Sequence, residues 1–85
     1  MGDAVNGRPQ KHSLTLKGHR TSVSLEAEFW AAFREIAEAE GKPVNTLASE
    51  IDTARAAGVG LASAIRVFIL MRLKSRYPEI TERQR

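Results

Sequence analysis

The sequence predicts a mostly α-helical domain that begins with extended chain. Apolar and polar residues alternate with a period of two over residues 13–25, which is typical of strands. Apolar residues then recur at helical spacing over residues 26–40, and glycine and proline separate two further apolar segments. A chain of 85 residues holds one domain at most and buries a modest core.

The extended segment reads as two short strands, at about residues 13–17 and 20–25. In both, leucine or valine alternates with serine or threonine. Gly18 lies between them, where it fits a bend or a bulge. Residues 1–12 show no periodicity and are expected to form a flexible N-terminal arm.

A first helix is expected over about residues 26–40. Ser24 is a plausible N-cap, and Glu26 and Glu28 place negative charge near the helix N-terminus. Gly41 fits the position just after the last turn. One face of this helix carries the apolar residues Leu25, Phe29, Phe33, Ile36 and Ala37.

Pro43 opens a second helix over about residues 44–57, and a glycine-rich loop separates it from a third helix over about 61–76. The domain is expected to span residues 13–77, with a tail at 78–85. The third helix is apolar on nearly every side, and such a helix must be buried. Because a chain of this length can hardly bury it alone, we expect a homodimer.

The strand leads to the same expectation, because an unpaired strand edge must find a partner. If residues 20–25 pair with the same residues of a second copy, an antiparallel two-stranded ribbon forms between two intertwined chains. Its inner face would hold Thr21, Val23 and Leu25, and its outer face Arg20, Ser22 and Ser24. A ribbon of this kind fits the major groove of DNA, and arginine and serine can bond to base edges.

The net charge of +3 is unevenly distributed. Residues 1–25 and 61–85 are basic, whereas residues 26–40 carry five acids and one base. A nucleic-acid contact is therefore expected near the N-terminus or in the C-terminal tail, and not on the acidic middle segment.

Three segments in order, HRTSVSLEAEFW, GKPVNTLASEID and GLASAIRVFIL, resemble a family of short bacterial ribbon-helix-helix proteins, the Arc/MetJ-like DNA-binding dimers. The match covers about residues 13–76, and residues 36–46 resemble the segment between the helices of the phage Arc repressor. The resemblance implies a homodimeric DNA-binding fold, to which the glycine-rich loop of this sequence adds a further C-terminal helix. In an ungapped alignment with Arc, the three base-contacting positions are Arg20, Ser22 and Ser24.

The resemblance also implies that backbone amides at the start of the second helix bind a phosphate, which suits any helix N-terminus. The phosphate-contacting residues expected here are Lys17, His19, Lys42, Val44, Asn45 and Thr46. An alternative remains open, because the family archetype has one long second helix. In that alternative residues 61–76 are the true second helix, and the phosphate site moves to Leu61, Ala62 and Ser63.

Other functional classes find little support. With no cysteine, no paired carboxylates in a recognisable cleft and no glycine-rich phosphate loop, no enzyme, metal or cofactor is expected. Trp30 is expected in the core, and Arg66 is expected either to pair with an acid or to extend its charged end to the surface. The polar first twelve residues do not look like a secretory signal, so we expect a cytoplasmic protein. The sequence thus favours a sequence-specific DNA-binding transcriptional regulator that acts as a repressor, with double-stranded DNA and a second copy as partners. The alternative is an antitoxin-type or other protein-interaction module with the same dimer fold.

Overall fold

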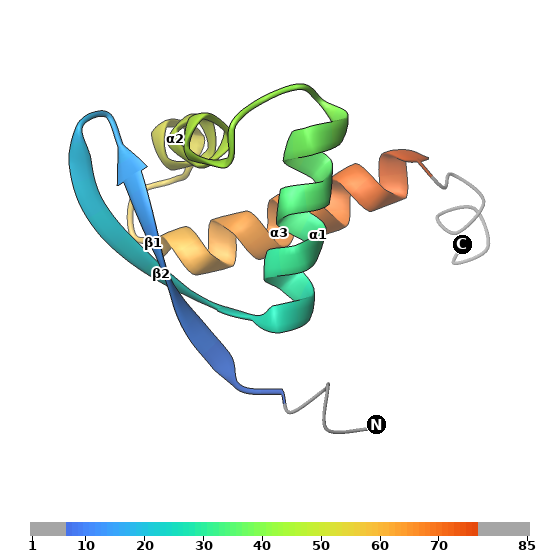
Figure 1. The fold of residues 1–85 in the computed structure, drawn as a ribbon, viewed down its shortest axis with the longest axis horizontal. Helices are drawn as coiled ribbons and strands as arrows, with labels where there is room; N and C mark the ends of the chain where they lie inside the picture. Colours follow the sequence, from blue (N-terminus) through green and yellow to red (C-terminus); the bar gives the residue numbers. More distant parts are fainter. Residues whose placement is uncertain (1–6, 77–85) are drawn as a thin grey trace.

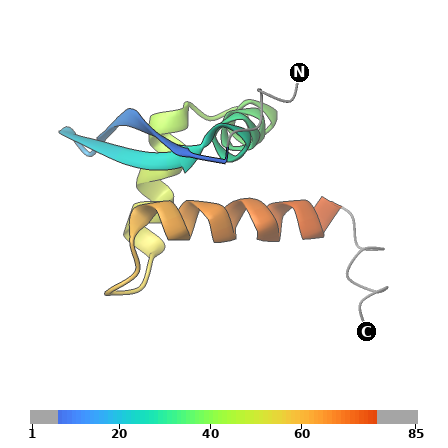
Figure 2. The same cartoon turned by 90° about the horizontal axis from the view of Figure 1, so that it is seen from below.

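The computed structural model describes residues 7–76, where a β-hairpin is followed by three helices. The elements labelled in Figure 1 are β1 (Pro9–Leu16), β2 (His19–Glu26), α1 (Ala27–Ala39), α2 (Val44–Ala54) and α3 (Leu61–Arg76). Figure 2 shows the hairpin and α1 in one layer, α3 in another, and α2 running from one to the other. The mostly helical fold with an N-terminal extended segment and an additional C-terminal helix is confirmed.

The outer boundaries fall partly outside the described residues. The tail expected at 78–85 lies outside them, and so does the first half of the arm expected at residues 1–12. Strand β1 begins at Pro9, so the end of the expected arm is strand and the hairpin is longer than the alternation alone indicated. Within residues 7–76, no helix is both long enough and apolar enough to cross a membrane.

A two-residue turn closes the hairpin. Lys17 and Gly18 both have positive φ, 53° and 84°, the combination that a type I′ turn requires. Glycine adopts this conformation without steric cost, and the twist of such a turn matches that of the strands. The expected bend at Gly18 is therefore a tight turn, and Lys17 belongs to the turn rather than to the first strand.

Both strands of the ribbon come from one chain. Strand β2 pairs with β1 from Leu16 opposite His19 to Pro9 opposite Glu26. This corrects the expected pairing of residues 20–25 with a second copy. The short turn is the cause, because it brings the neighbouring strand alongside at a much smaller entropic cost than recruiting a second molecule. In the described part of the chain the sheet has two strands, so the other edge of β2 carries no strand.

The core lies between the inner face of the hairpin and the three helices. Val23 and Leu25 are 4% and 0% exposed, so their assignment to the core is confirmed, whereas Thr21 on the same face is exposed. Burying each large apolar side chain contributes about 1.5–3 kcal/mol. The buried side chains among the described residues are all apolar: Leu14, Leu16, Val23, Leu25, Phe33, Ile36, Ala37, Leu47, Ala48, Ile51, Ile65 and Ile69.

The two ends of α1 differ in how well they were predicted. Strand β2 continues to Glu26, which takes the N-cap position without a side-chain hydrogen bond. Ser24 therefore lies inside the strand and is not the N-cap. At the other end Gly41 has a φ of 69°, and the amides of Gly41 and Lys42 donate to carbonyls of the last turn at 3.1 and 2.9 Å. These bonds form a Schellman motif, so the expected helix end is confirmed.

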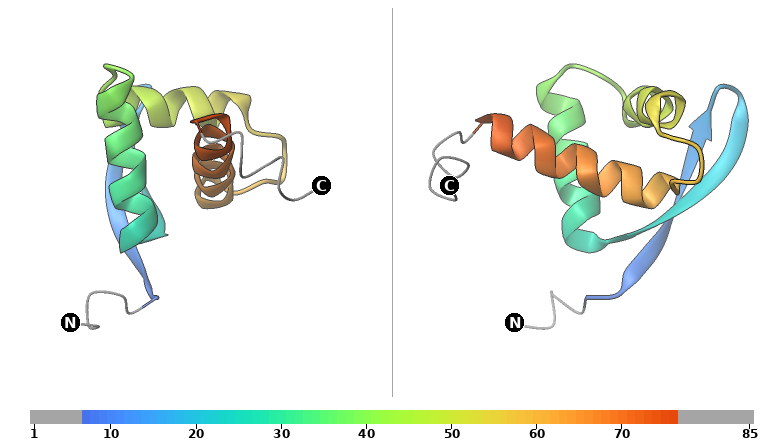
Figure 3. Two further views of the ribbon diagram at one scale, coloured as in Figure 1. Left: turned by 90° about the vertical axis from the view of Figure 1, so that its right-hand side faces the viewer. Right: turned by 180° about the vertical axis from the view of Figure 1, so that it is seen from behind.

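Helix α2 ends at Ala54, earlier than expected, and α3 has the expected bounds. The Arg55 backbone is extended, and its guanidinium donates to the Asp52 carboxylate and to the Val59 carbonyl oxygen. Gly58, with a φ of 87°, turns the chain within this loop. The right-hand view in Figure 3 shows α3 nearest to the viewer, crossing over α1.

Two arginines tie α3 to its neighbours. Arg66 donates to Glu26 Oε1 from Nε at 3.1 Å and from Nη2 at 2.9 Å, which confirms the expected pairing with an acid. Arg72 pairs with Glu40, and its guanidinium carbon lies 4.5 Å from the centre of the Phe68 ring. The first of these contacts fixes the end of the hairpin on the middle of α3.

Engineered cysteines test the intramolecular ribbon. Ser13 and Ser22 lie opposite each other, and the natural sequence has no cysteine. Combining Ser13→Cys with Ser22→Cys should give a disulfide within one chain on mild oxidation, because directly opposed residues suit disulfide geometry. Mass spectrometry should find monomer with no free thiol. If Ser22→Cys alone cross-links two copies efficiently while the double variant forms no internal bond, the ribbon is intermolecular.

A pH series tests the contact between Glu26 and Arg66. A backbone amide, that of Glu26 itself, and then Arg66 donate to the Glu26 carboxylate and hold its pKa below the usual value of 4.5. A lowered pKa adds stability above the unfolded-state pKa, and this stability is lost as the pH falls through the folded-state value. Glu26→Gln should lower the melting temperature at neutral pH and reduce its fall on acidification. An unchanged acid dependence would contradict this role.

Candidate nucleic-acid interface

The outer face of the hairpin is a polar surface turned away from the helices. Because side chains alternate along a strand, it consists of the residues between the buried ones on both strands. All six of its central side chains are exposed. These residues, called the outer face below, are Lys11, Ser13 and Thr15 on β1 and Arg20, Ser22 and Ser24 on β2.

The outer-face residues form directly opposed pairs. Lys11 lies opposite Ser24, and Thr15 lies opposite Arg20. The Thr15 amide donates to Asn45 Oδ1 at 3.0 Å, so it points away from β2 and Thr15 belongs to a non-hydrogen-bonded pair. Because such pairs alternate with hydrogen-bonded ones, the other outer-face pairs are also of this type, in which side chains lie closest together. The result is a dense double row of hydrogen-bonding groups.

The three residues expected to contact bases, Arg20, Ser22 and Ser24, lie together in one row of this face. The second row, on β1, was not predicted from the sequence, because the residues before Ser13 were expected to form a flexible arm. The sequence did contain a sign of the longer strand, because Lys11 occupies the next polar position of the alternating pattern before Ser13. The outer face carries positive charge at Lys11 and Arg20 and has no acidic member.

The N-terminus of α2 flanks the ribbon beside β1. The bond from the Thr15 amide to Asn45 holds this helix end against the strand edge, and no side chain caps the helix. The amides of Val44, Asn45 and Thr46 belong to the first turn, where amides lack partners within the helix. The Asn45 side chain is thus engaged with β1, which leaves its backbone amide as the group that can meet an anion.

The remaining expected phosphate contacts lie at different places. Lys17 is exposed at the tip of the turn, in line with the ribbon. His19 is exposed but pairs with the buried Leu16, so it lies on the inner-face side of the strand and does not join the outer face. Lys42 Nζ lies 2.8 Å from Glu50 Oε1, in an exposed ion pair of the kind that contributes about 0–1 kcal/mol.

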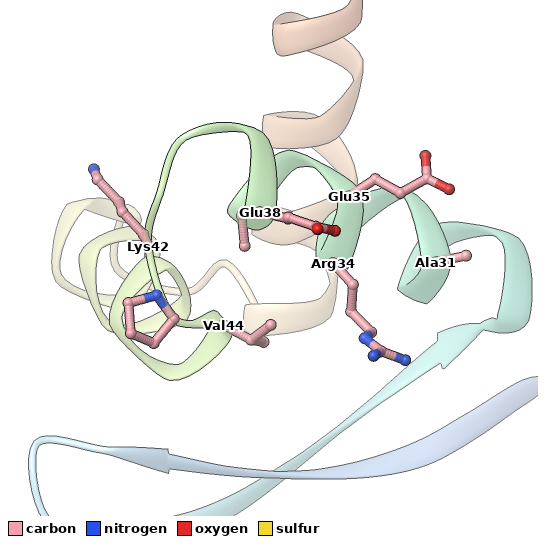
Figure 4. A pocket seen from close by; sticks show the side chains of 8 residues that line it. Ala31, Arg34, Glu35, Glu38, Lys42 and Val44 are labelled. Carbon is pink, nitrogen blue, oxygen red and sulfur yellow. The ribbon is translucent and has the colours of Figure 1, made fainter.

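A shallow surface hollow separates the end of α1 from the start of α2. Arg34 and Val44 line it together with the acidic Glu35 and Glu38. In Figure 4 the Arg34 side chain extends toward the side of the hairpin, whereas the Glu35 side chain extends away from it. Arg34, the one basic residue among residues 26–40, therefore adds a cation on the ribbon side of an otherwise acidic helix.

The inner side of the hairpin is braced by aromatic packing. The His12 and Trp30 rings stack with centroids 4.1 Å apart and planes inclined by 8°. Trp30 also lies 6.1 Å from the Phe33 ring, so its expected place against the core is confirmed. These rings are not on the outer face. In residues 7–76, no three side chains with metal-binding groups come together.

A two-stranded ribbon with a polar outer face, supported by helices on its other face, is the architecture of proteins that read DNA with β-strands. Comparison with known protein families supports this assignment to the DNA-binding proteins that use β-strands, because the family model of the ribbon-helix-helix domain matches residues 9–73. The chain therefore belongs to the ribbon-helix-helix domain family. This is a family of typically non-enzymatic DNA-binding regulators and related dimeric modules. Searches of the curated proteins and of the solved structures found no match to the chain.

Proposed function

We propose that this protein is a sequence-specific transcriptional regulator, acting as a repressor, that places the outer face of its hairpin in the major groove of DNA. The observation that carries the proposal is the exposed double row of basic and hydroxyl side chains on a two-stranded ribbon. The major groove is about 12 Å wide and admits such a ribbon. Arg20 can donate two hydrogen bonds to guanine, and Ser22 and Ser24 can donate or accept at base edges.

The N-terminus of α2 supports the same docking. Its position beside the ribbon allows the amides of Val44, Asn45 and Thr46 to bind a backbone phosphate while the outer face lies in the groove. This favours α2 over α3 as the phosphate-binding helix, because α3 lies in the layer on the other side of the hairpin (Figure 2). Lys17 at the turn can contact a further phosphate. Lys42 can do the same once its exposed ion pair with Glu50 breaks.

We further propose that the protein acts as a homodimer through the exposed side of α3. Val67, Leu70 and Met71 are 57%, 53% and 58% exposed and share one side of the helix. They lie near its middle, so a two-fold axis there brings the apolar strips of two copies together in antiparallel fashion. This orientation also keeps the basic ends at Lys74 and Arg76 apart. A second copy on the free edge of β2 would give a four-stranded sheet, which is too broad for the groove.

Binding of duplex DNA tests the proposed regulator. Arg20→Ala should weaken binding to a selected site by about tenfold or more, because a bidentate base contact provides about 1–3 kcal/mol of discrimination. Fluorescence anisotropy over a salt series measures this. Arg76→Ala is the matched control, since it removes the same charge from the end of α3. Equal affinity of wild type and Arg20→Ala at moderate salt would reject the strand as the reading element.

Sedimentation or light scattering tests the dimer surface. Leu70→Glu should raise the dissociation constant of the dimer by roughly thirtyfold or more, because two copies each lose a half-buried leucine, about 2 kcal/mol in all. Ala31→Glu places the same charge on an exposed position of α1 and should leave the dimer intact. A monomeric wild type would refute the proposed dimer. If Leu70→Glu instead abolishes co-purification of another small protein, the surface binds that protein, which would support the alternative function as an interaction module.

A further inference from the structure

The two strands of the hairpin carry matching chemistry. Residues 11–16 read Lys-His-Ser-Leu-Thr-Leu, and residues 20–25 read Arg-Thr-Ser-Val-Ser-Leu. When the two segments are compared position by position, the matched residues are two basic residues, two polar residues, two serines, two branched aliphatic residues, two hydroxyl residues and two leucines. The hairpin thus contains a short internal repeat, with one copy on each strand.

The pairing register converts this repeat into a spatial symmetry. Ser13 lies opposite Ser22 at the centre of the outer face. A two-fold rotation about an axis through this pair, perpendicular to the sheet, exchanges antiparallel strands and preserves chain direction. It would place Lys11 on Arg20 and Thr15 on Ser24. The register agrees, because Lys11 lies opposite Ser24 and Arg20 lies opposite Thr15.

The core explains part of this repeat but not all of it. Leu14 and Leu16 on β1, and Val23 and Leu25 on β2, are all at most 8% exposed, so burial against the same helices accounts for their likeness. The outer positions face solvent, and packing places no demand on them. A basic residue, a serine and a further hydroxyl residue occupy equivalent exposed positions of both strands. This likeness therefore points to an external ligand that both strands contact.

We propose that β1 provides half of the DNA-reading surface, so that one chain carries a complete ribbon. Lys11, Ser13 and Thr15 would contact one half of the bound sequence as Arg20, Ser22 and Ser24 contact the other. This inference rests on the proposed DNA-binding function and specifies its site. From Lys11 to Thr15 the strand spans about 14 Å, or about four base pairs at 3.4 Å each.

The likeness of the two halves is imperfect, and this defines the kind of sequence recognised. Arginine presents a planar fork that selects guanine through two bonds, whereas lysine is a flexible point donor. Each chain therefore reads an approximate palindrome with a strong guanine preference at the end near Arg20. The preference at the end near Lys11 is weaker.

Selection from random duplex DNA, followed by binding measurements, tests this proposal. Lys11→Ala and Arg20→Ala should each weaken binding by about tenfold and lose base preference at opposite ends of the selected motif. Arg76→Ala should change neither end of the motif. Lys11→Arg should strengthen the guanine preference at the weaker end and make the motif more nearly palindromic. This last result separates base reading from a general effect of charge.

Three other outcomes would contradict the inference, and they differ in what they imply for the proposed function. If Lys11→Ala behaves like the Arg76→Ala control while Arg20→Ala loses binding, β1 does not read DNA, and the proposed function stands without this inference. If Lys11→Arg leaves the motif unchanged, Lys11 acts on the backbone only and the inference also fails. If wild type selects no sequence, both the inference and the proposed function fail. Circular dichroism of each variant checks that the exposed substitutions preserve the fold.

Discussion

The tight turn at Lys17 and Gly18 sets the register of the hairpin, and with it the position of both functional and buried faces. Two consecutive residues with positive φ close the hairpin with no spare residue, which fixes the register of every pair beyond them. Because side chains alternate along a strand, a slip of one residue would move the leucines to solvent and the serines into the core. The turn thus separates an apolar inner face from a polar outer face.

The helices then hold the hairpin at both ends. Arg66 of α3 binds Glu26 at the end of β2, and Asn45 of α2 accepts a hydrogen bond from Thr15 near the turn. The second contact matters for function as well as for stability, since it places a helix N-terminus beside the exposed rows. The same bond that satisfies a strand amide therefore positions the groups proposed to bind phosphate.

Acidic and basic side chains lie on different surfaces of the domain. The exposed acids of α1 stand apart from the outer face, whose charged members are the basic Lys11 and Arg20. A polyanion is therefore attracted to the ribbon and repelled by most of α1, so its approach is directed without a uniformly basic surface. The exposed apolar strip of α3 lies on a different side of the helix from the buried Ile65 and Ile69, so the second copy proposed above would not compete with DNA for the outer face.

Local patterns in the sequence were enough to predict most of the elements and which of their faces are buried. Period-two alternation identified Val23 and Leu25 as buried, helical spacing identified the stripe of α1, and Gly41 marked its end through a local hydrogen-bonding motif. It also placed Arg20, Ser22 and Ser24 on one side of a strand, because alternation is a property of the backbone alone. These features depend on neighbours within a few residues, and such patterns can be read directly.

The pairing of the strands could not be predicted from these local patterns. Strand pairing is a contact between distant backbone groups, and the alternating pattern is equally consistent with a partner in the same chain or in a second one. The structure extended β1 back to Pro9, joined it to β2, and so brought Lys11 into the row opposite Ser24. It likewise decided that the Asn45 side chain serves the strand edge, because that contact joins residues far apart in sequence.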